Sequence, residues 1–359
     1  MMKCFIYLLA ALLINTSIAK ASNKHADLKF FKADNSNIQY YGRIDFADKT
    51  KPRIWAPGVY IKAKFKGAYC EAIINDEALG GNNHNYLEIV IDNNAPYRIQ
   101  ITQKNNVVKV PVGLSAGEHT ILICKDTESN IGYIDFIGFR CEALLSLPAK
   151  PKRKIEYFGD SITSGAGMDQ SVIACDKGQW YDQHNAYMTY GARTSRNLDA
   201  QWQLTSWAGI GLIHSCCNLK YVLPQVYDKV FLAADSITWD FKNYQPDVVT
   251  ICLGQNDGPQ DSTKFCGAYV KFISSLRQQY PNADIICLNS PMADNTLSPV
   301  LKKYITSITA YMNKQSDKKV SKYFFSRRFS NGCGTHPDID EHKLIADELT
   351  AYIKRLKGW

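Results

Sequence analysis

The sequence predicts a fold in two parts: an all-β sandwich or jelly-roll domain, then an α/β domain with a parallel sheet covered by helices. Two observations predict it. Before about residue 147, short runs of alternating polarity recur every ~8–12 residues without a strong helix, as in sandwiches and jelly rolls. After about residue 152, strand-like runs alternate with helical ones, which is typical of a parallel sheet buried on both faces.

Residues 1–21 have the pattern of an export signal. A lysine precedes an apolar run over residues 5–14, and Ala19 and Ala21 form an A-x-A cleavage pattern. The run is too short to span a membrane, and a buried N-terminal helix is the alternative interpretation. We therefore expect a secreted or periplasmic protein that is not inserted in a membrane.

The composition is that of a globular protein, with 45% hydrophobic and 21% charged residues. The net charge of +8 is modest for 359 residues. The densest basic patch, residues 150–154, lies between the two domains and is interpreted as a linker, so we expect no nucleic-acid partner. Most of the 11 cysteines stand singly in apolar runs, as Cys124, Cys252 and Cys287 do, and are expected in the core.

The β-rich domain is predicted over residues 25–147. Alternating polarity predicts strands, and clusters of Gly, Asn and Asp between them predict turns. The expected strands are residues 58–67, 86–92, 117–126 and 132–139.

The α/β domain is predicted over residues 152–359. Short apolar runs predict its strands, and apolar residues at helical spacing predict its helices. The expected strands are residues 154–160, 202–209, 247–254 and 284–290, and the expected helices are residues 262–280, 299–315 and 338–356.

Polar, glycine-bearing segments follow three of these strands, at residues 159–161, 208–211 and 254–257. A fourth polar stretch, residues 331–342, leads into the last helix. Ligands of open α/β sheets bind outside the carboxyl ends of the strands. Each segment also fits a purely structural role, as a helix cap, a turn or a helix lead-in. Together they supply a serine, a histidine, a side-chain amide and a glycine N–H, the set that acyl transfer needs.

Residues 155–342 resemble the SGNH (GDSL-type) hydrolases, whose four sequence blocks occur here in order. The β-rich front part is similar to the jelly-roll domain of carbohydrate esterase family 2. The four blocks are Gly159-Asp160-Ser161, Gly209, Gly254-Gln255-Asn256-Asp257 and His336, and the front segments that carry the second resemblance are "YYGRIDF" (40–46), "PGVYIKAKF" (57–65), "GEHTILICKDTE" (117–128) and "GYIDFIGF" (132–139).

The resemblance implies a role for each block. Ser161 is the nucleophile, and His336 takes its proton and later protonates the leaving alcohol. The oxyanion is held by the backbone N–H groups of Ser161 and Gly209 and by the side-chain amide of Asn256. The G-x-S-x-G elbow of the α/β-hydrolases is absent, because position 163 is threonine.

The sequence departs from the SGNH pattern in its histidine block, which is usually D-x-x-H. Cys333 stands where the aspartate would be, and Asp338 and Asp340 lie on the other side of His336. We therefore expect a Ser161–His336 dyad, with a backbone carbonyl or another side chain holding the imidazole. His342 is the alternative base, although its position in an apparent amphipathic helix favours a surface or capping role.

Family 2 esterases remove O-acetyl groups from plant-type polysaccharides, so the resemblance implies acetylated xylan, mannan or their oligosaccharides as substrate. Trp207 and Asp160 are the candidate substrate-binding residues, and Trp180 and Trp239 are further candidates; ordinary core packing is the alternative for each tryptophan. His84, His119, His184 and His214 are expected to be structural or peripheral.

No metal or organic cofactor is implied, and a monomer is expected. Two other functions stay open. A carbohydrate-binding protein with a degenerate esterase domain would explain the missing aspartate, and a lipase or thioesterase could use the same scaffold.

Overall fold

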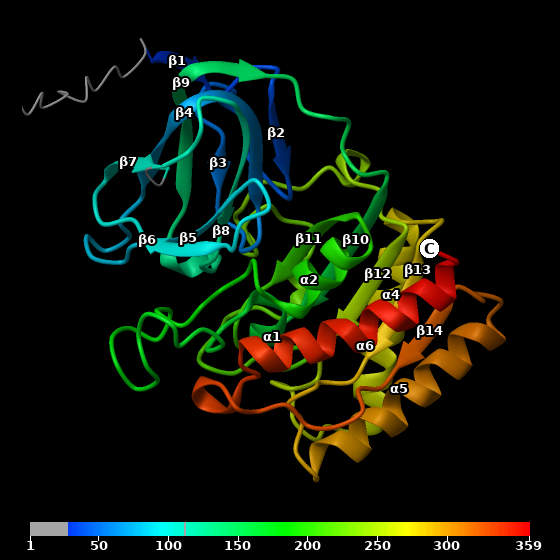
Figure 1. The fold of residues 1–359 in the computed structure, drawn as a ribbon. Coiled ribbons are helices and arrows are strands. Elements are labelled where there is room, and N and C mark those ends of the chain that lie inside the picture. Colours follow the sequence, from blue (N-terminus) through cyan, green and yellow to red (C-terminus); the bar gives the residue numbers. More distant parts are fainter. Residues whose placement is uncertain (1–27, 111–112) are drawn as a thin grey trace, which may run out of the picture.

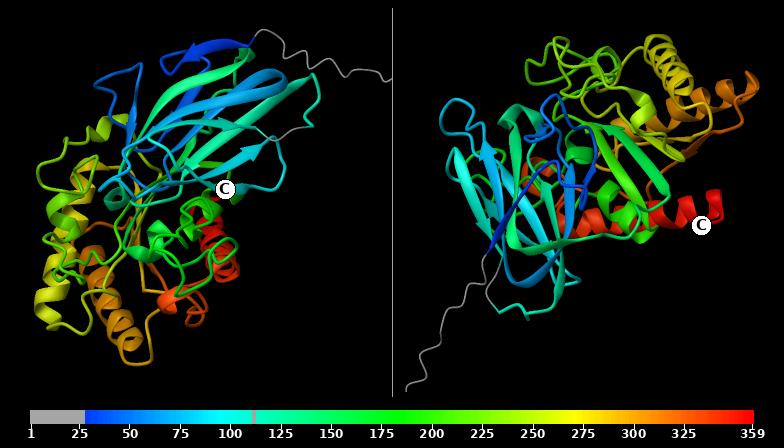
Figure 2. Two further views of the ribbon diagram at one scale, coloured as in Figure 1. Left: turned by 90° about the vertical axis from the view of Figure 1, so that its left-hand side faces the viewer. Right: turned by 90° about the horizontal axis from the view of Figure 1, so that it is seen from above.

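The computed structural model describes residues 28–110 and 113–359, and the export signal predicted at residues 1–21 lies outside this range. Two parts lie side by side: an N-terminal part of antiparallel strands and a C-terminal part with a parallel sheet between helices (Figure 1; Figure 2 gives two further views). This architecture confirms the fold class predicted from the sequence.

The N-terminal strands form one nine-stranded antiparallel sheet that folds over its own apolar core. β4 is the longest strand: its first half pairs with β8 and its second half with β7. On its other edge it pairs with β9, with a register shift between Lys66 and Cys70. The strands are β1 (Lys29–Lys32), β2 (Ile38–Tyr41), β3 (Arg53–Ile54), β4 (Tyr60–Asp76), β5 (Tyr86–Ile91), β6 (Tyr97–Gln100), β7 (Asn105–Lys109), β8 (Glu118–Lys125) and β9 (Ile134–Leu145).

The C-terminal part is built on a five-stranded parallel sheet in the order β11-β10-β12-β13-β14. Four of the strands were predicted. The exception is β14, whose four residues VSKY include only one buried side chain and therefore lack an apolar run. The strands are β10 (Arg153–Gly159), β11 (Ala200–Ser206), β12 (Val248–Cys252), β13 (Asp284–Leu288) and β14 (Val320–Tyr323).

Helices cover both faces of this sheet. Side chains of α4 and α5 pack with Val249 and Ile251 in one apolar core, whereas those of α2 and α6 pack with Val248 and Ile286 in another. The three longest helices match the predicted ones to within two residues. The helices are α1 (Ser161–Ser164), α2 (Tyr190–Asn197), α3 (Leu223–Val226), α4 (Ser262–Gln279), α5 (Leu297–Lys314) and α6 (Ile339–Lys357), with the 3₁₀ turns η1 (Ser129–Ile131), η2 (Phe241–Asn243) and η3 (Cys333–Thr335).

Within residues 28–110 and 113–359, no helix combines the length and the apolar character needed to cross a membrane.

The strand order places a topological switch between β10 and β12. From β10 the chain continues to β11 on one side, and β12 lies on the other side. Loops that leave two such strands diverge, and ligands of doubly wound sheets bind in the crevice between them. Ser161 directly follows β10 and Asn256 follows β12, so the fold brings both residues to this crevice.

The two parts are joined by a buried ion pair. Arg43, in the N-terminal part, is 1% exposed and donates to Glu156 of β10 at 2.8 Å and to the carbonyls of Tyr227 and Lys229. Glu156 also accepts from Gln203 and Thr205, both at 2.7 Å. Burying a charge is costly unless it is paired and hydrogen-bonded, as both of these groups are.

Aromatic packing completes this interface. The ring of Tyr60 stacks on Trp202 of β11 with a centroid distance of 3.8 Å, and Tyr41 stacks on Tyr60 at 4.2 Å. The indole N–H of Trp202 donates to the carbonyl of Gly58 at 2.9 Å. The orientation of the β-rich part is therefore set by directional polar contacts as well as by apolar burial.

We expect Arg43→Met to lower the free energy of unfolding by about 3–5 kcal/mol, because it leaves the Glu156 carboxylate buried without its cation. Urea denaturation would measure the loss. Lys343→Met is the matched control, since Lys343 pairs with Asp347 at an exposed site and such a pair contributes about 0–1 kcal/mol. Equal losses in the two variants would contradict this account of the interface.

Candidate active site

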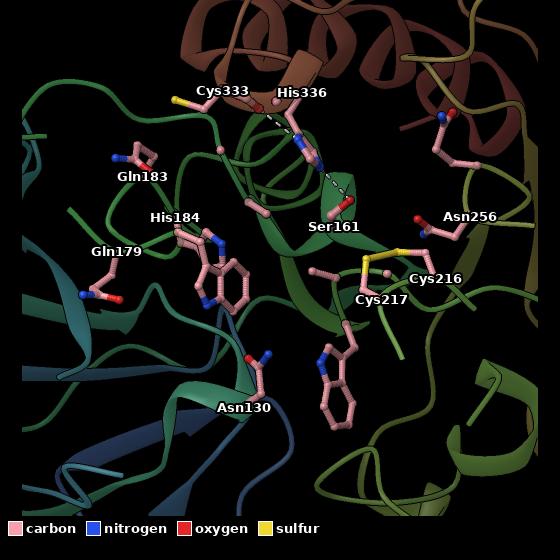
Figure 3. A pocket seen from close by; sticks show the side chains of 18 of the residues that line it. Asn130, Ser161, Gln179, Gln183, His184, Cys216, Cys217, Asn256, Cys333 and His336 are labelled. Atoms are coloured by element: carbon pink, nitrogen blue, oxygen red, sulfur yellow. Dashed lines mark hydrogen bonds between the residues drawn. A yellow bond between two sulfur atoms is a disulfide. The ribbon is translucent and has the colours of Figure 1, made fainter. Parts of the chain in front are cut away.

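Ser161 lies at the start of α1, immediately after β10. The side chain of Asp160 accepts a hydrogen bond from the N–H of Ile162 at 3.1 Å, which caps the short helix. The Ser161 hydroxyl is 2.8 Å from Nε2 of His336, although the two residues are 175 positions apart in the chain. The structure thus brings together the serine and the histidine that the sequence singled out (Figure 3).

His336 is held by a backbone carbonyl. Its Nδ1 lies 3.0 Å from the carbonyl oxygen of Cys333, which can only accept, so Nδ1 carries the proton. Nε2 is then free to accept the proton of the Ser161 hydroxyl. The Cys333 carbonyl therefore occupies the orienting position that an aspartate has in a Ser-His-Asp triad.

The turn that presents this carbonyl is tightly constrained. Gly334 and Thr335 have left-handed backbone angles, with φ of 58° and 61°. Cys333 is bonded to Cys175 by a disulfide, and its N–H donates to the carbonyl of Gly167 at 2.7 Å. A Cβ atom at Gly167 would lie 2.7 Å from the Cys333 carbonyl oxygen, so glycine permits this approach.

Burial lowers the pKa of His336 below its ordinary value of 6.5, and the hydrogen bond to the Cys333 carbonyl opposes that shift only partly. The imidazole is consequently neutral at pH 7, which is the state in which it can act as a base.

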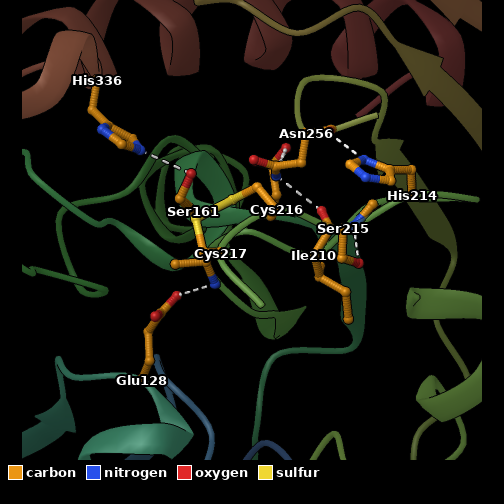
Figure 4. The surroundings of a disulfide bond; sticks show 12 residues. Glu128, Ser161, Ile210, His214, Ser215, Cys216, Cys217, Asn256 and His336 are labelled. Carbon is orange, nitrogen blue, oxygen red and sulfur yellow. Dashed lines mark hydrogen bonds between the residues drawn. A yellow bond between two sulfur atoms is a disulfide. The ribbon is translucent and has the colours of Figure 1, made fainter. Parts of the chain in front are cut away.

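Three groups predicted to stabilise an oxyanion lie around Ser161. Gly209 has φ of 84°, and a Cβ atom there would come within 2.9 Å of the Cys216 sulfur. The side-chain amide of Asn256 donates to the Ile210 carbonyl at 2.9 Å (Figure 4). It also donates to the carboxyl group of Asp160 at 3.3 Å. In the described part of the chain, the N–H groups of Ser161 and Gly209 have no acceptor.

The loop that carries Gly209 is organised by two carboxylates. Asp257 accepts from three consecutive N–H groups, those of residues 212–214, at 2.7–3.1 Å. Glu128, from the N-terminal part, accepts from the N–H of Ala208 at 2.7 Å and from the hydroxyl of Ser164 in α1 (Figure 4). Burial raises the pKa of Glu128 to about 7. The N-terminal part therefore reaches the segment next to Gly209.

Ser161, Gly209, Asn256 and His336 all line one cavity of about 820 Å³ (Figure 3). Other walls come from both parts of the molecule. Trp180 and Trp207, two of the candidate substrate-binding residues, line it. Residues with no predicted role in the site line it too, among them Asn130, Gln183, His184 and Met292.

The remaining candidates lie elsewhere. Asp160 is 1% exposed, does not line the cavity and caps α1; its contact with substrate stays a prediction. Trp239 is buried in the core near Arg43. His342 is fully buried and not at the surface, but it has the alternative capping role, since its Nδ1 accepts from the N–H of Tyr190, the first residue of α2, at 3.0 Å.

The cysteines divide between core and site. Cys124, Cys252 and Cys287 are free and buried, as predicted. Cys216 and Cys217 are adjacent in the chain and form a second disulfide, which lines the cavity beside Gly209. The sequence spacings specified neither disulfide. No group of three or more metal-binding side chains occurs among the residues that the structure describes.

Two protein-family models match the chain. Residues 40–151 match the model described as carbohydrate esterase 2 N-terminal, and residues 157–322 match the GDSL-like lipase/acylhydrolase family. The two matches correspond to the two parts of the fold.

Relatives of this chain have esterase names. The chain is 34% identical over 339 residues to the cellulase/esterase CelE of Acetivibrio thermocellus, with 91% of this chain aligned. It spans 40% of the length of CelE. It is 28% identical to an acetylxylan esterase / glucomannan deacetylase of Cellvibrio japonicus, with 91% of each protein aligned.

A solved structure shares the whole architecture. A family two carbohydrate esterase from Clostridium thermocellum, in complex with cellohexaose, superposes with a TM-score of 0.82 and 32% identity, covering 90% of this chain and 99% of that one.

We expect the acid limb of the pH profile of kcat/KM, measured on an aryl acetate, to have its midpoint below pH 6.5. The base must be neutral, and burial lowers the pKa of His336, so activity is lost only as the pH falls through that lowered value. The variants Glu128→Gln and Asp160→Asn each remove a buried carboxyl group whose pKa is raised to about 7. Their pH profiles show whether either carboxyl group, and not His336, sets the acid limb. A midpoint above 6.5 in all three proteins would contradict the assignment.

We expect Asp338→Ala to reduce stability but not kcat. Asp338 accepts from the N–H of Glu341 and caps α6, so its loss costs about 1 kcal/mol, measurable by thermal unfolding. Asp340→Ala, at an exposed position, is the control. A loss of roughly 10⁴ in kcat for either variant would mean that an aspartate orients His336 after all.

Proposed function

Because the chain belongs to family 2 of the carbohydrate esterases, we propose that it removes O-acetyl groups from plant-type polysaccharides, xylan or mannan, or from their oligosaccharides. One observation carries the proposal. The Ser161 hydroxyl, the His336 imidazole and the Cys333 carbonyl form a continuous hydrogen-bonded series at the floor of a cavity.

In the first step of this reaction, the Ser161 oxygen attacks the acetyl carbonyl carbon while Nε2 of His336 takes the hydroxyl proton. The negative charge that develops on the carbonyl oxygen faces the N–H groups of Ser161 and Gly209 and the amide of Asn256. As the bond to the sugar oxygen breaks, His336 gives its proton to that oxygen, which leaves as a hydroxyl group.

In the second step, water attacks the acetylated Ser161 and gives its proton to His336. Acetate leaves, and the proton returns to the serine. Throughout, the Cys333 carbonyl keeps the proton of the imidazole on Nδ1.

The relatives support the substrate class. The names of the Cellvibrio japonicus relatives refer to acetylated xylan and glucomannan, and the Clostridium thermocellum structure holds a cello-oligosaccharide. The cavity of about 820 Å³ is in the range of sites that bind small molecules or short oligomers.

We also propose that the protein is exported and acts as a monomer. The A-x-A pattern at residues 19–21 supports export. The two disulfides between described cysteines suit an oxidising compartment.

The proposal predicts that the wild-type protein releases acetate from acetylated xylan, acetylated glucomannan and an aryl acetate, and that Ser161→Ala lowers kcat by about 10⁴- to 10⁶-fold. Ser275→Ala, on the exposed side of α4, is the control. Acetate assays that detect no release from any substrate would refute the esterase function and favour a carbohydrate-binding protein. Undiminished activity of Ser161→Ala would remove this serine from the mechanism.

A further inference from the structure

His184 is a buried polar residue in the cavity wall with no role in the reaction described above. Its side chain is fully buried, and it lines the same cavity as Ser161 (Figure 3). Neither ring nitrogen has a hydrogen-bond partner among the residues that the structure describes. Leaving a buried polar atom unpaired costs about 1–3 kcal/mol, and native proteins rarely tolerate it without a reason.

The imidazole of His184 is uncharged. Burial lowers its pKa well below the ordinary value, and the positive charge of Arg98 contributes in the same direction. A neutral imidazole offers one N–H donor and one nitrogen acceptor. A sugar hydroxyl likewise both donates and accepts, so the two groups are complementary.

Two more polar atoms in the same wall lack partners. The side-chain oxygen of Asn130 and the indole N–H of Trp207 are buried without a hydrogen bond within the described part of the chain. Asn130 belongs to η1, whose preceding carbonyls, those of Thr127 and Glu128, accept from the buried Lys125 ammonium at 2.7 and 3.1 Å. The N-terminal part therefore presents Asn130 on a fixed turn.

A tryptophan stands beside these groups. Trp180 is 52% exposed, lines the cavity and packs edge-to-face against His184 with a centroid distance of 4.7 Å. Its ring is thus an apolar surface next to polar atoms, the combination that suits a pyranose, which has C–H faces and a polar edge. The segment that carries both residues is tied to the His336 turn by the Cys175–Cys333 disulfide.

We propose that His184 and Asn130, with the indole N–H of Trp207, form a subsite that binds free hydroxyl groups of the sugar unit whose acetyl group reacts with Ser161, and that Trp180 packs against the apolar face of this sugar or its neighbour. The inference rests on the proposed deacetylase function and makes it more specific. A lipid acyl chain in this cavity would leave all these polar atoms unpaired, which disfavours a lipase.

The subsite predicts a selective loss of activity. His184→Phe keeps a ring against Trp180 but removes both hydrogen-bonding atoms. We expect it to lower kcat/KM on acetylated xylo- or manno-oligosaccharides by about 10- to 100-fold, while kcat/KM on an aryl acetate, which has no sugar, changes less than about threefold. His184→Gln, which retains a donor and an acceptor, should recover part of the loss.

Inhibition by the deacetylated oligosaccharide, measured with the aryl acetate as substrate, tests the same contact without acetylated glycan. We expect the inhibition constant to rise about 10-fold or more in His184→Phe. His119→Gln is the matched control, because His119 hydrogen-bonds Asp92 at 2.8 Å in the N-terminal sheet and does not line the cavity.

Equal losses on sugar and aryl acetates, or no loss on either, would overturn the subsite while leaving the esterase function intact. A wild-type protein that cleaves aryl acetate but no acetylated glycan, and is not inhibited by the sugars, would instead refute the proposed glycan substrate. If His184→Phe does not fold, as judged by thermal unfolding, Asn130→Ala at the cavity surface provides the same comparison with the same outcomes.

Discussion

The guanidinium of Arg43 is buried where the β-rich part meets the parallel sheet, and the arrangement of the site depends on the contacts that neutralise it. A charge removed from water must be paired and hydrogen-bonded. Its partners, Glu156 and two carbonyls, all belong to the C-terminal part, so these directional contacts stabilise the observed orientation of the two parts. That orientation brings Glu128 against the segment that carries Gly209, and Asn130 into the cavity wall. The β-rich part is therefore a component of the site, not only an attached module.

The second constraint is the use of a carbonyl in place of a carboxylate beside His336. The Cys333 carbonyl fixes the position of the imidazole proton, which is what catalysis by a neutral base requires. It carries only a dipole, so it stabilises a protonated imidazole less than an aspartate would, in keeping with the lowered pKa of His336. The position of this oxygen must then be held to within about 0.5 Å. The left-handed turn at Gly334, the close approach of Gly167 and the Cys175–Cys333 disulfide together provide that precision.

The elements that could be predicted are those in which apolar residues recur at helical spacing over several turns or stand together in a run. The helices α4, α5 and α6 bury one face over several turns, so periodicity alone locates them. β12 (VVTIC) and β13 (DIICL) are short, mostly apolar runs, and β10 and β11 carry apolar residues among polar ones. The helix α2 has eight residues, which is too short for a period to emerge. The strands β1, β2, β3, β6, β7 and β14 have five residues or fewer and are at most half buried, unlike the equally short β12 and β13, so they lack an apolar run. Their positions are set by pairing with strands that are distant in the sequence.

The sequence by itself determined the two-part fold and which residues could perform acyl transfer, because Ser161, Gly209, Asn256 and His336 each stand in a recognisable block at the end of a strand or before a helix. Only the tertiary structure decided what surrounds them. The carbonyl that holds His336 is a backbone group, so its role cannot be predicted from the type of residue at position 333. Glu128, Asn130 and His184 carry no motif, and Asp160 turned inward to cap α1. Glu128 and Asn130 reach the site only because the two parts dock, and His184 lines it because distant segments pack together. The Cys333 carbonyl and the Asp160 cap are local contacts, but they depend on the conformation of the backbone, which residue types do not specify.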